Sequence, residues 1–126
     1  MRGRDARWGH VLTAMATPFA ADGSVDLAVA ADLARWLCAN GSDALVINGT
    51  TGESPTTTAA EKDALVRLAV ELIGSERVVA GIGGYNTAEV VEAAHAAHAA
   101  GAGALLAVVP YYNRPNQEGL YRHFQA

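Results

Sequence analysis

The 126-residue sequence has little of several residue types, and each scarcity excludes a class of protein. Cys38 is its single cysteine, which excludes an internal disulfide and favours a reducing, cytoplasmic location. Its apolar runs fall short of the roughly 20 residues that a transmembrane helix needs. We therefore predict no membrane span, and we expect the basic start of the chain not to be a secretory signal.

Positive charge is also scarce. Nine Lys and Arg residues are outnumbered by 13 Asp and Glu residues, which gives a formal net charge of −4. Domains that bind nucleic acids are typically basic, with clustered Lys and Arg side chains, so we expect no nucleic-acid partner. Lys62 is the only lysine in the sequence. It falls in the first turns of an expected helix, where we predict a solvated side chain.

The sequence does contain an alternation of apolar runs and helical patterns that repeats four times. The apolar runs predict strands over residues 11–17, 44–47, 77–82 and 104–109, and helices are expected over 27–39, 59–73, 87–98 and 117–126. Continuous apolar strands that alternate with helices are typical of a parallel sheet covered by helices. Each repeat of roughly 30 residues has the size of one βα unit.

Two closures of such a sheet fit this alternation, an open doubly wound sheet and a (β/α)₈ barrel. Polar side chains follow the second, third and fourth strands, as they do at the C-terminal rim of a barrel, which favours the barrel. A complete barrel needs about 250 residues. We therefore predict an α/β fold comprising the first four βα units of a TIM barrel. Residues 1–126 would form the N-terminal half of a single catalytic domain, with a flexible tail over 1–9.

Capping residues indicate where the helices begin. Asp26 can cap the first helix, Thr58 and Glu61 form a capping box for the second, and Asn86 with Glu89 forms another cap pair. The first helix also carries an apolar stripe that we expect to face the core, made of Leu27, Ala30, Ala34, Leu37 and Cys38.

The segment Gly49-Thr50-Thr51-Gly52-Glu53 lies between the second strand and the second helix. Its glycines allow tight turns and close approach of a ligand to the backbone, and its two hydroxyls can donate and accept hydrogen bonds. Backbone N–H groups near a helix start also favour negative charge. The segment therefore predicts a site for a small anion, although the same residues also make an ordinary strand-to-helix turn. We expect the Glu53 carboxylate to accept backbone hydrogen bonds in this turn.

Two histidines and one glycine run are weaker candidates. His95 and His98 are three residues apart on one helix, but no third ligand accompanies them, so we expect surface histidines and no metal. The run Gly81-Ile82-Gly83-Gly84 lacks the full dinucleotide-binding spacing, so we expect no cofactor.

A second loop follows the fourth strand and reads Pro110-Tyr111-Tyr112-Asn113-Arg114-Pro115. Together with the threonine-bearing loop it makes the sequence pattern specific enough to indicate a family. With both loops, and with matching segments at residues 12–19, 79–83 and 116–124, the sequence closely resembles the dihydrodipicolinate synthase (4-hydroxy-tetrahydrodipicolinate synthase) family. The resemblance implies a Schiff-base lyase on a (β/α)₈ barrel. Such an enzyme condenses pyruvate with L-aspartate 4-semialdehyde for lysine and diaminopimelate biosynthesis, and it is a homotetramer built as a dimer of dimers.

The resemblance also implies roles for individual residues. Thr50 and Tyr112 match two members of a proton-relay triad, and Tyr111 matches a tyrosine that crosses a tight dimer interface to complete the partner's site. Thr50, Thr51 and Gly52 match the segment that binds the pyruvate carboxylate. The Schiff-base lysine has no match among these 126 residues, so we expect them to be inactive alone.

Positions of the family's lysine-feedback site can be matched as well. Ser54 and Glu89 agree with lysine-inhibited members, whereas Ala59, Lys62 and Tyr85 stand where those members have two histidines and an asparagine. We therefore expect weak or absent feedback by lysine. Two other interpretations stay open: another pyruvate-dependent aldolase such as N-acetylneuraminate lyase, and a non-catalytic half-barrel that serves as an interaction module.

Overall fold

The computed structural model of the chain describes residues 8–126. The flexible tail predicted for residues 1–9 therefore lies mostly outside the described residues. Its last two members are packed: the Trp8 ring lies beside Gly103, and the backbone at Gly9 approaches the Asp43 side chain so closely that a Cβ at Gly9 would collide with it.

Four strands alternate with four helices along the chain. In order they are β1 (Leu12–Ala14), α1 (Leu27–Ala39), β2 (Ala44–Ile47), α2 (Ala59–Ile73), β3 (Val78–Gly81), α3 (Thr87–Ala99), β4 (Ala104–Leu106) and α4 (Gln117–Gln125). Short 3₁₀ turns at Thr50–Gly52, Ser54–Thr56 and Ser75–Arg77 join some of them. The predicted alternation is confirmed, and the β2 boundaries agree residue for residue.

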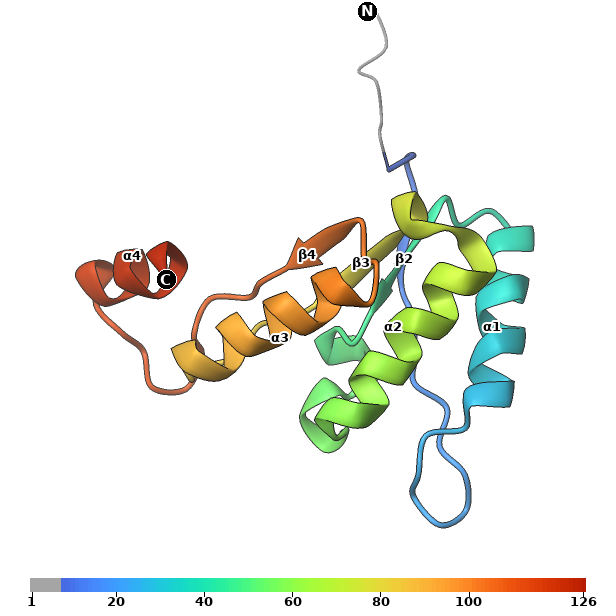
Figure 1. The fold of residues 1–126 in the computed structure, drawn as a ribbon, viewed down its shortest axis with the longest axis horizontal. Coiled ribbons are helices and arrows are strands. Elements are labelled where there is room, and N and C mark those ends of the chain that lie inside the picture. Colours follow the sequence, from blue (N-terminus) through green and yellow to red (C-terminus); the bar gives the residue numbers. More distant parts are fainter. Residues whose placement is uncertain (1–7) are drawn as a thin grey trace, which may run out of the picture.

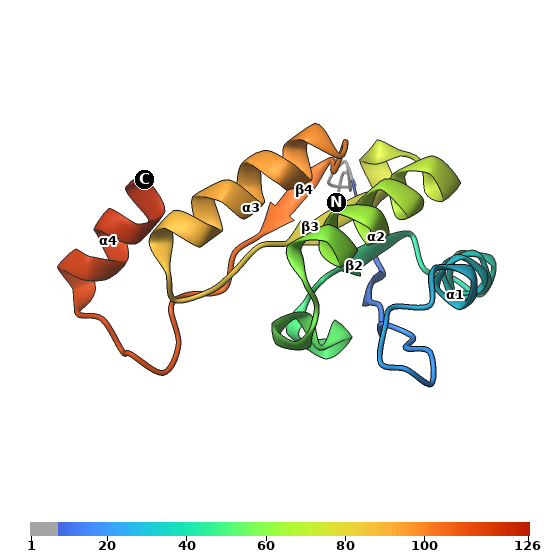
Figure 2. The ribbon, with the colours of Figure 1, turned by 60° about the horizontal axis from the view of Figure 1, so that its bottom comes forward.

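The strands form one parallel sheet in the order β1-β2-β3-β4. Helices α1, α2 and α3 lie on one side of this sheet (Figures 1 and 2). A doubly wound sheet would reverse its strand order and place helices on both faces. The sequential order with helices on one side is the arrangement of successive βα units in a (β/α)₈ barrel.

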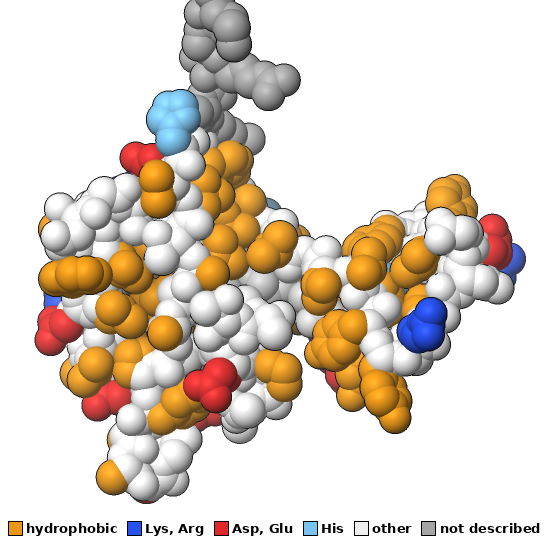
Figure 3. Space-filling view, turned by 180° about the vertical axis from the view of Figure 1, so that it is seen from behind, with side chains coloured by type: hydrophobic (Ala, Val, Ile, Leu, Met, Phe, Trp, Pro, Cys, Tyr) orange, Lys and Arg blue, Asp and Glu red, His pale blue; other side chains and the backbone are white. Residues whose placement is uncertain are grey.

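The core lies between the two central strands and the helices. All four residues of β2 are buried, and Leu45, Leu65, Val66 and Val78 are its largest fully buried side chains. The edge strands are more open, since Leu12 is 41% exposed and Leu106 is 50% exposed. The face turned away from the helices carries many apolar side chains (Figure 3).

Two of the three predicted caps form as expected. The Asp26 carboxylate accepts a hydrogen bond from Val29 N, and Thr58 and Glu61 make both halves of a capping box. The third prediction was wrong in its chemistry. The Asn86 side chain donates to the Glu89 carboxylate at 2.9 Å and makes no bond to the helix backbone, because the two side chains satisfy each other.

Some predicted boundaries and one core residue were also wrong. The strands expected over 11–17 and 104–109 are only three residues long each, because each edge strand has a single neighbour to pair with. Leu27 was expected in the core but is 41% exposed. Within residues 8–126, α1 has a helix neighbour on one side only, so its first turn is left open (Figure 1).

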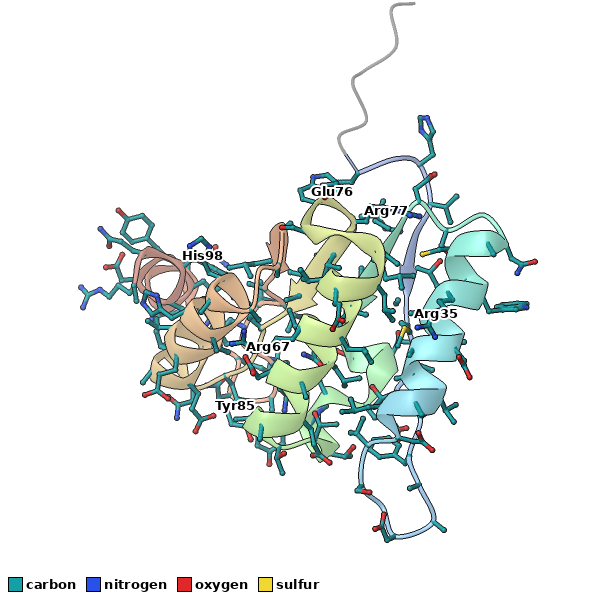
Figure 4. The ribbon with its side chains drawn as sticks, turned by 45° about the vertical axis from the view of Figure 1, so that its right-hand side comes forward. Arg35, Arg67, Glu76, Arg77, Tyr85 and His98 are labelled. Carbon is teal, nitrogen blue, oxygen red and sulfur yellow. The ribbon has the colours of Figure 1, made fainter. Side chains whose placement is uncertain are left out.

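A hydrogen-bonded clasp closes the amino end of the sheet. The Asp43 carboxylate accepts from His10 N and Val11 N, at 2.7 and 2.9 Å. The Arg77 guanidinium donates to the carbonyl oxygens of Asp43 and Ser42, at 2.6 and 3.0 Å. Figure 4 shows Arg77 at this end of the molecule and Tyr85 at the other. The clasp therefore ties the starts of β1, β2 and β3 together.

Candidate functional site

The loop after β2 begins with a change of backbone direction. Asn48 has a φ of 60°, in the left-handed region, which asparagine tolerates better than most residues. The chain then makes a 3₁₀ turn in which Gly52 N donates to Gly49 O and Glu53 N donates to Thr50 O, both at 3.0 Å. This turn presents the Thr50 and Thr51 side chains to solvent at the carboxyl end of the sheet.

Gly52 fixes the turn against the end of β1. The buried Thr17 hydroxyl donates to Gly52 O at 2.6 Å. A Cβ at Gly52 would lie 2.9 Å from Met15 O, closer than real side chains come to backbone atoms. A glycine is therefore required here, and the threonine hydroxyls keep a fixed position relative to the first two strands.

Glu53 does not act as the sequence predicted. Its carboxylate makes no hydrogen bond to any part of the chain that the structure describes; instead its carbonyl oxygen accepts from Thr56 N and from the Thr56 hydroxyl, both at 2.8 Å. The residue has a φ of 55°, so it turns the chain through its backbone. Its side chain is left exposed to solvent.

A cavity of about 660 Å³ opens between the carboxyl ends of β2, β3 and β4 and the first turns of α2 and α3. Polar groups reach it from several elements. Its lining includes Thr50, Ser54, Lys62, Tyr85, Glu89 and Tyr111. The cavity lies at the sheet end to which the polar loops were assigned from sequence.

The three positions that the family resemblance matched to a lysine-feedback site come together in this cavity. They come from three parts of the chain: Ser54 follows β2, Tyr85 follows β3 and Glu89 lies in α3. All three line the cavity. The Tyr85 ring also meets the Tyr111 ring edge to face, with centroids 5.4 Å apart and planes at 88°. This geometry is favourable for aromatic pairs, so it links the loop after β3 with the loop after β4.

The residues expected to act on substrate are divided. Thr50 and Tyr111 line the cavity, whereas the exposed Thr51 and the buried Gly52 are not part of its lining. Tyr112 was expected to bring its hydroxyl toward Thr50 over a shared cavity. In this structure it does not: Tyr112 is 92% exposed and absent from the cavity lining. Its φ of 66° lies in the left-handed region.

Lys62 is less solvated than the sequence predicted. The side chain is half-buried in the cavity wall, and its ammonium donates to Thr57 O at 2.6 Å. Burial lowers the pKa of Lys62 below its usual value, and the nearby Glu61 carboxylate partly opposes this. The side chain turns back across the start of α2 because Thr57 O offers an acceptor there.

Sequence reasoning missed Asn48. Its side chain is buried beside Lys62, donates to Lys62 O at 3.0 Å, and lines the cavity. Its Oδ1 atom is buried with no partner among residues 8–126. The available signal was an asparagine between a buried strand and a glycine, since asparagine adopts left-handed backbone readily.

The two spaced histidines are surface residues. His95 and His98 are both exposed, and no group of three metal-ligating side chains occurs in the part of the chain that the structure describes. The same residues, 8–126, include no helix that is long and apolar enough to cross a membrane.

Comparison with known proteins shows which family this chain resembles. Residues 7–126 match the Dihydrodipicolinate synthetase family. Over 122 residues the chain is 57% identical to a 4-hydroxy-tetrahydrodipicolinate synthase of Mycolicibacterium paratuberculosis, covering 96% of this chain and 41% of the relative. The chain thus spans about two fifths of the length of that relative.

Solved structures agree in fold. Dihydrodipicolinate synthase from Cyanidioschyzon merolae, solved with lysine bound, superposes with a TM-score of 0.89 at 43% identity, covering 94% of this chain and 41% of that one. The enzyme from Acinetobacter baumannii, solved in complex with pyruvate, gives 0.87 at 36% identity, covering 91% and 40%. These neighbours are TIM barrels, so the four βα units have the predicted fold of a half-barrel.

Proposed function

The chain belongs to the dihydrodipicolinate synthetase family, and from that premise we propose that it is the N-terminal half of the catalytic domain of a 4-hydroxy-tetrahydrodipicolinate synthase. This enzyme condenses pyruvate with L-aspartate 4-semialdehyde through a Schiff base, in lysine and diaminopimelate biosynthesis. The observation that carries the proposal is 57% identity, over 96% of this chain, to a protein of that name.

The turn at residues 50–52 is the proposed binding site for pyruvate. Thr50 and Thr51 project hydroxyls at the carboxyl end of the sheet, where TIM-barrel enzymes carry their active sites. The bond from Thr17 to Gly52 O holds this turn rigid, which favours precise placement of a carboxylate. A structure of a relative in complex with pyruvate supports this choice of substrate.

Thr50 and Tyr112 are the proposed members of the proton relay. Formation of a Schiff base moves protons to and from a carbinolamine, and hydrogen-bonded hydroxyls can pass them along without holding a stable charge. The Tyr112 side chain is free to join such a chain because it is almost wholly exposed. The relay requires the complete enzyme to bring the Thr50 and Tyr112 hydroxyls together.

Tyr111 is the proposed interface residue. Its ring is supported on one edge by Tyr85 and remains 43% exposed, so an aromatic face is held in place and open to a partner. We expect it to reach the site of a second subunit within a tight dimer. Two such dimers would form the homotetramer.

The Schiff-base lysine is proposed not to be Lys62. The Lys62 ammonium is bonded to Thr57 O at the start of α2, on the helix side of the sheet. Residues 1–126 alone should therefore form no adduct with pyruvate. Borohydride trapping of the isolated segment with labelled pyruvate checks this, and label found on Lys62 would contradict it.

The cavity between α2 and α3 is the proposed effector site. Ser54, Tyr85 and Glu89 line it, and a relative of similar fold has been solved with lysine bound. In this chain Lys62, a positively charged residue, also lines the cavity. Because like charges repel, a lysine effector would be disfavoured here, and we propose weak feedback.

Turnover of the full-length enzyme tests the function. We expect synthesis from pyruvate and L-aspartate 4-semialdehyde, and no cleavage of N-acetylneuraminate. Cleavage of the sugar acid without synthesis would identify an aldolase of the other specificity. Absence of both activities, in a folded full-length protein, would favour the interaction module.

A further inference from the structure

The loop between β4 and α4, residues 107–116, carries both tyrosines and an unusual backbone. Tyr112 has a φ of 66° and Arg114 a φ of 44°, so two residues with side chains adopt the left-handed region. Such conformations cost of order 1–3 kcal/mol each and persist only where the surroundings hold them. One bond inside the loop, from Asn113 N to Tyr111 O at 2.8 Å, closes the turn at Tyr112. Contacts outside the loop hold the rest of it.

Those contacts fall on alternate residues of the segment that leads into α3. A Cβ at Gly83 would collide with Val108, so the start of the loop packs directly on that glycine. The Tyr111 ring rests edge-on against the Tyr85 ring. Beyond the loop, the His123 Nδ1 atom on α4 lies 2.8 Å from the Thr87 hydroxyl, at the first residue of α3.

The bond between His123 and Thr87 links two elements that are otherwise self-contained. The Asn116 cap and the Arg122–Glu118 ion pair of α4 are both local to that helix. These bonds therefore do not fix the position of α4 relative to α3. His123 is only 8% exposed, and its ring meets the neighbouring Phe124 ring edge to face. Its Nε2 atom is buried with no partner among residues 8–126, which leaves the Thr87 hydroxyl as the ring's polar contact there.

We propose that His123 and Thr87 are positioning residues for the tyrosine loop. By holding α4 against the start of α3, they fix the far end of the loop that carries Tyr112. The inference rests on the proposed synthase function for its effect on rate, because Tyr112 is the relay tyrosine. Neither His123 nor Thr87 lines the cavity, so we expect their effect to pass through the loop.

Turnover of the full-length enzyme with four variants tests the effect on rate. Thr87→Val keeps the shape but removes the hydroxyl, and Thr87→Ser restores it. His123→Asn keeps a polar atom near the Nδ1 position, whereas His123→Gln places it near Nε2. Because small misplacements of a catalytic group can cost about 100-fold, we expect Thr87→Val and His123→Gln to lower kcat by about 10- to 100-fold.

The KM for pyruvate should stay unchanged in all four variants, because the Thr50 turn is untouched. Thr87→Ser and His123→Asn should recover most of the rate. A loss of kcat that the conservative variants fail to rescue, or an equal change in KM, would overturn the positioning role.

A second measurement does not depend on activity. Chymotrypsin can cleave after Tyr112 in the loop and after Trp36 on α1, and both side chains are exposed, at 92% and 60%. In the full-length protein we expect Thr87→Val to speed cleavage at Tyr112 several-fold over wild type, with the rate at Trp36 unchanged. Thr87→Ser should match wild type at both sites.

These two readouts separate the two proposals. Faster cleavage at Tyr112 in a protein without synthase activity would uphold the clamp and reject the proposed function. Unchanged cleavage and unchanged kcat in Thr87→Val would reject the clamp and leave the proposed function standing.

Discussion

The two ends of the parallel sheet are built differently. At the amino end, Asp43 and Arg77 join the starts of three strands through four hydrogen bonds to backbone groups. At the carboxyl end there is a cavity of about 660 Å³, and Asn48 Oδ1 is buried without a partner in the described chain. The amino end is closed by hydrogen bonds, whereas the carboxyl end holds an open cavity and a polar atom that is unpaired within residues 8–126.

Backbone strain follows the same division. All four non-glycine residues with positive φ in residues 8–126 lie in the loops after β2 and β4: Asn48, Glu53, Tyr112 and Arg114. Strained backbone concentrates at functional sites. TIM-barrel enzymes likewise place stability at the amino end of the strands and chemistry at the carboxyl end. This chain has a hydrogen-bonded amino end and a cavity at its carboxyl end within four βα units.

The largest expected effect is at the carboxyl end. Thr50→Val in the full-length enzyme removes the hydroxyl while keeping the shape, and general acid–base groups contribute about 10²- to 10⁴-fold. We expect kcat to fall by about that amount with little change in melting temperature. Thr56→Val makes the same change in the same loop but outside the cavity, and it should lower kcat far less. Equal losses in the two variants would show that the loop, and not the Thr50 hydroxyl, matters.

The next effect is at the amino end and concerns stability. Arg77→Ala removes two charged hydrogen bonds to the Asp43 and Ser42 carbonyl oxygens. We expect the free energy of unfolding to fall by about 1–3 kcal/mol in urea titrations, with kcat unchanged. Arg67→Ala, which breaks the exposed pair with Asp63, serves as the control and should cost less. A selective loss of kcat in Arg77→Ala would break the comparison between the two ends.

The charge of Asp43 should make the clasp sensitive to acid. Hydrogen bonds from His10 N and then Val11 N lower the pKa of Asp43 below its ordinary value of 3.8. A lowered pKa contributes stability that is present above pH 3.8 and is lost as pH falls through the folded-state pKa. Unfolding titrations of wild type and Asp43→Asn should therefore differ near neutral pH and converge in acid. A difference that grows as pH falls would contradict this.

The smallest expected effect concerns regulation. Millimolar L-lysine should barely change the rate of the full-length enzyme, because the positively charged residue Lys62 lines the cavity where an effector would bind. Lys62→His lowers the charge and should make the enzyme more sensitive to lysine, whereas Lys62→Arg keeps the charge and should not. Strong inhibition of the wild-type enzyme by lysine would reject the proposal.

Local interactions made much of the fold predictable from sequence. The Asp26 cap and the Thr58–Glu61 capping box depend on residues three apart, so their sequence spacing was sufficient. The β2 boundaries followed from a fully buried apolar run. Ser54, Tyr85 and Glu89, which were grouped by the family resemblance, line one cavity, and their regulatory role stays a prediction.

Features that depend on contacts between distant segments were not predictable. Tyr112 lies outward and has a left-handed backbone, and nothing in the sequence of the loop requires either. Lys62 was assigned to solvent because its bond to Thr57 O depends on how the chain enters α2. His123 resembled any helix residue until α4 was placed beside Thr87, 36 residues earlier in the sequence.

The central claim is that Thr50 and Tyr112 act as one relay although they lie apart in this structure. A double-mutant cycle of kcat, with Thr50→Val, Tyr112→Phe and the pair in the full-length enzyme, tests it most directly. The account predicts that the double variant is about as slow as the slower single variant. Losses that multiply would show that the two hydroxyls work independently and would contradict it.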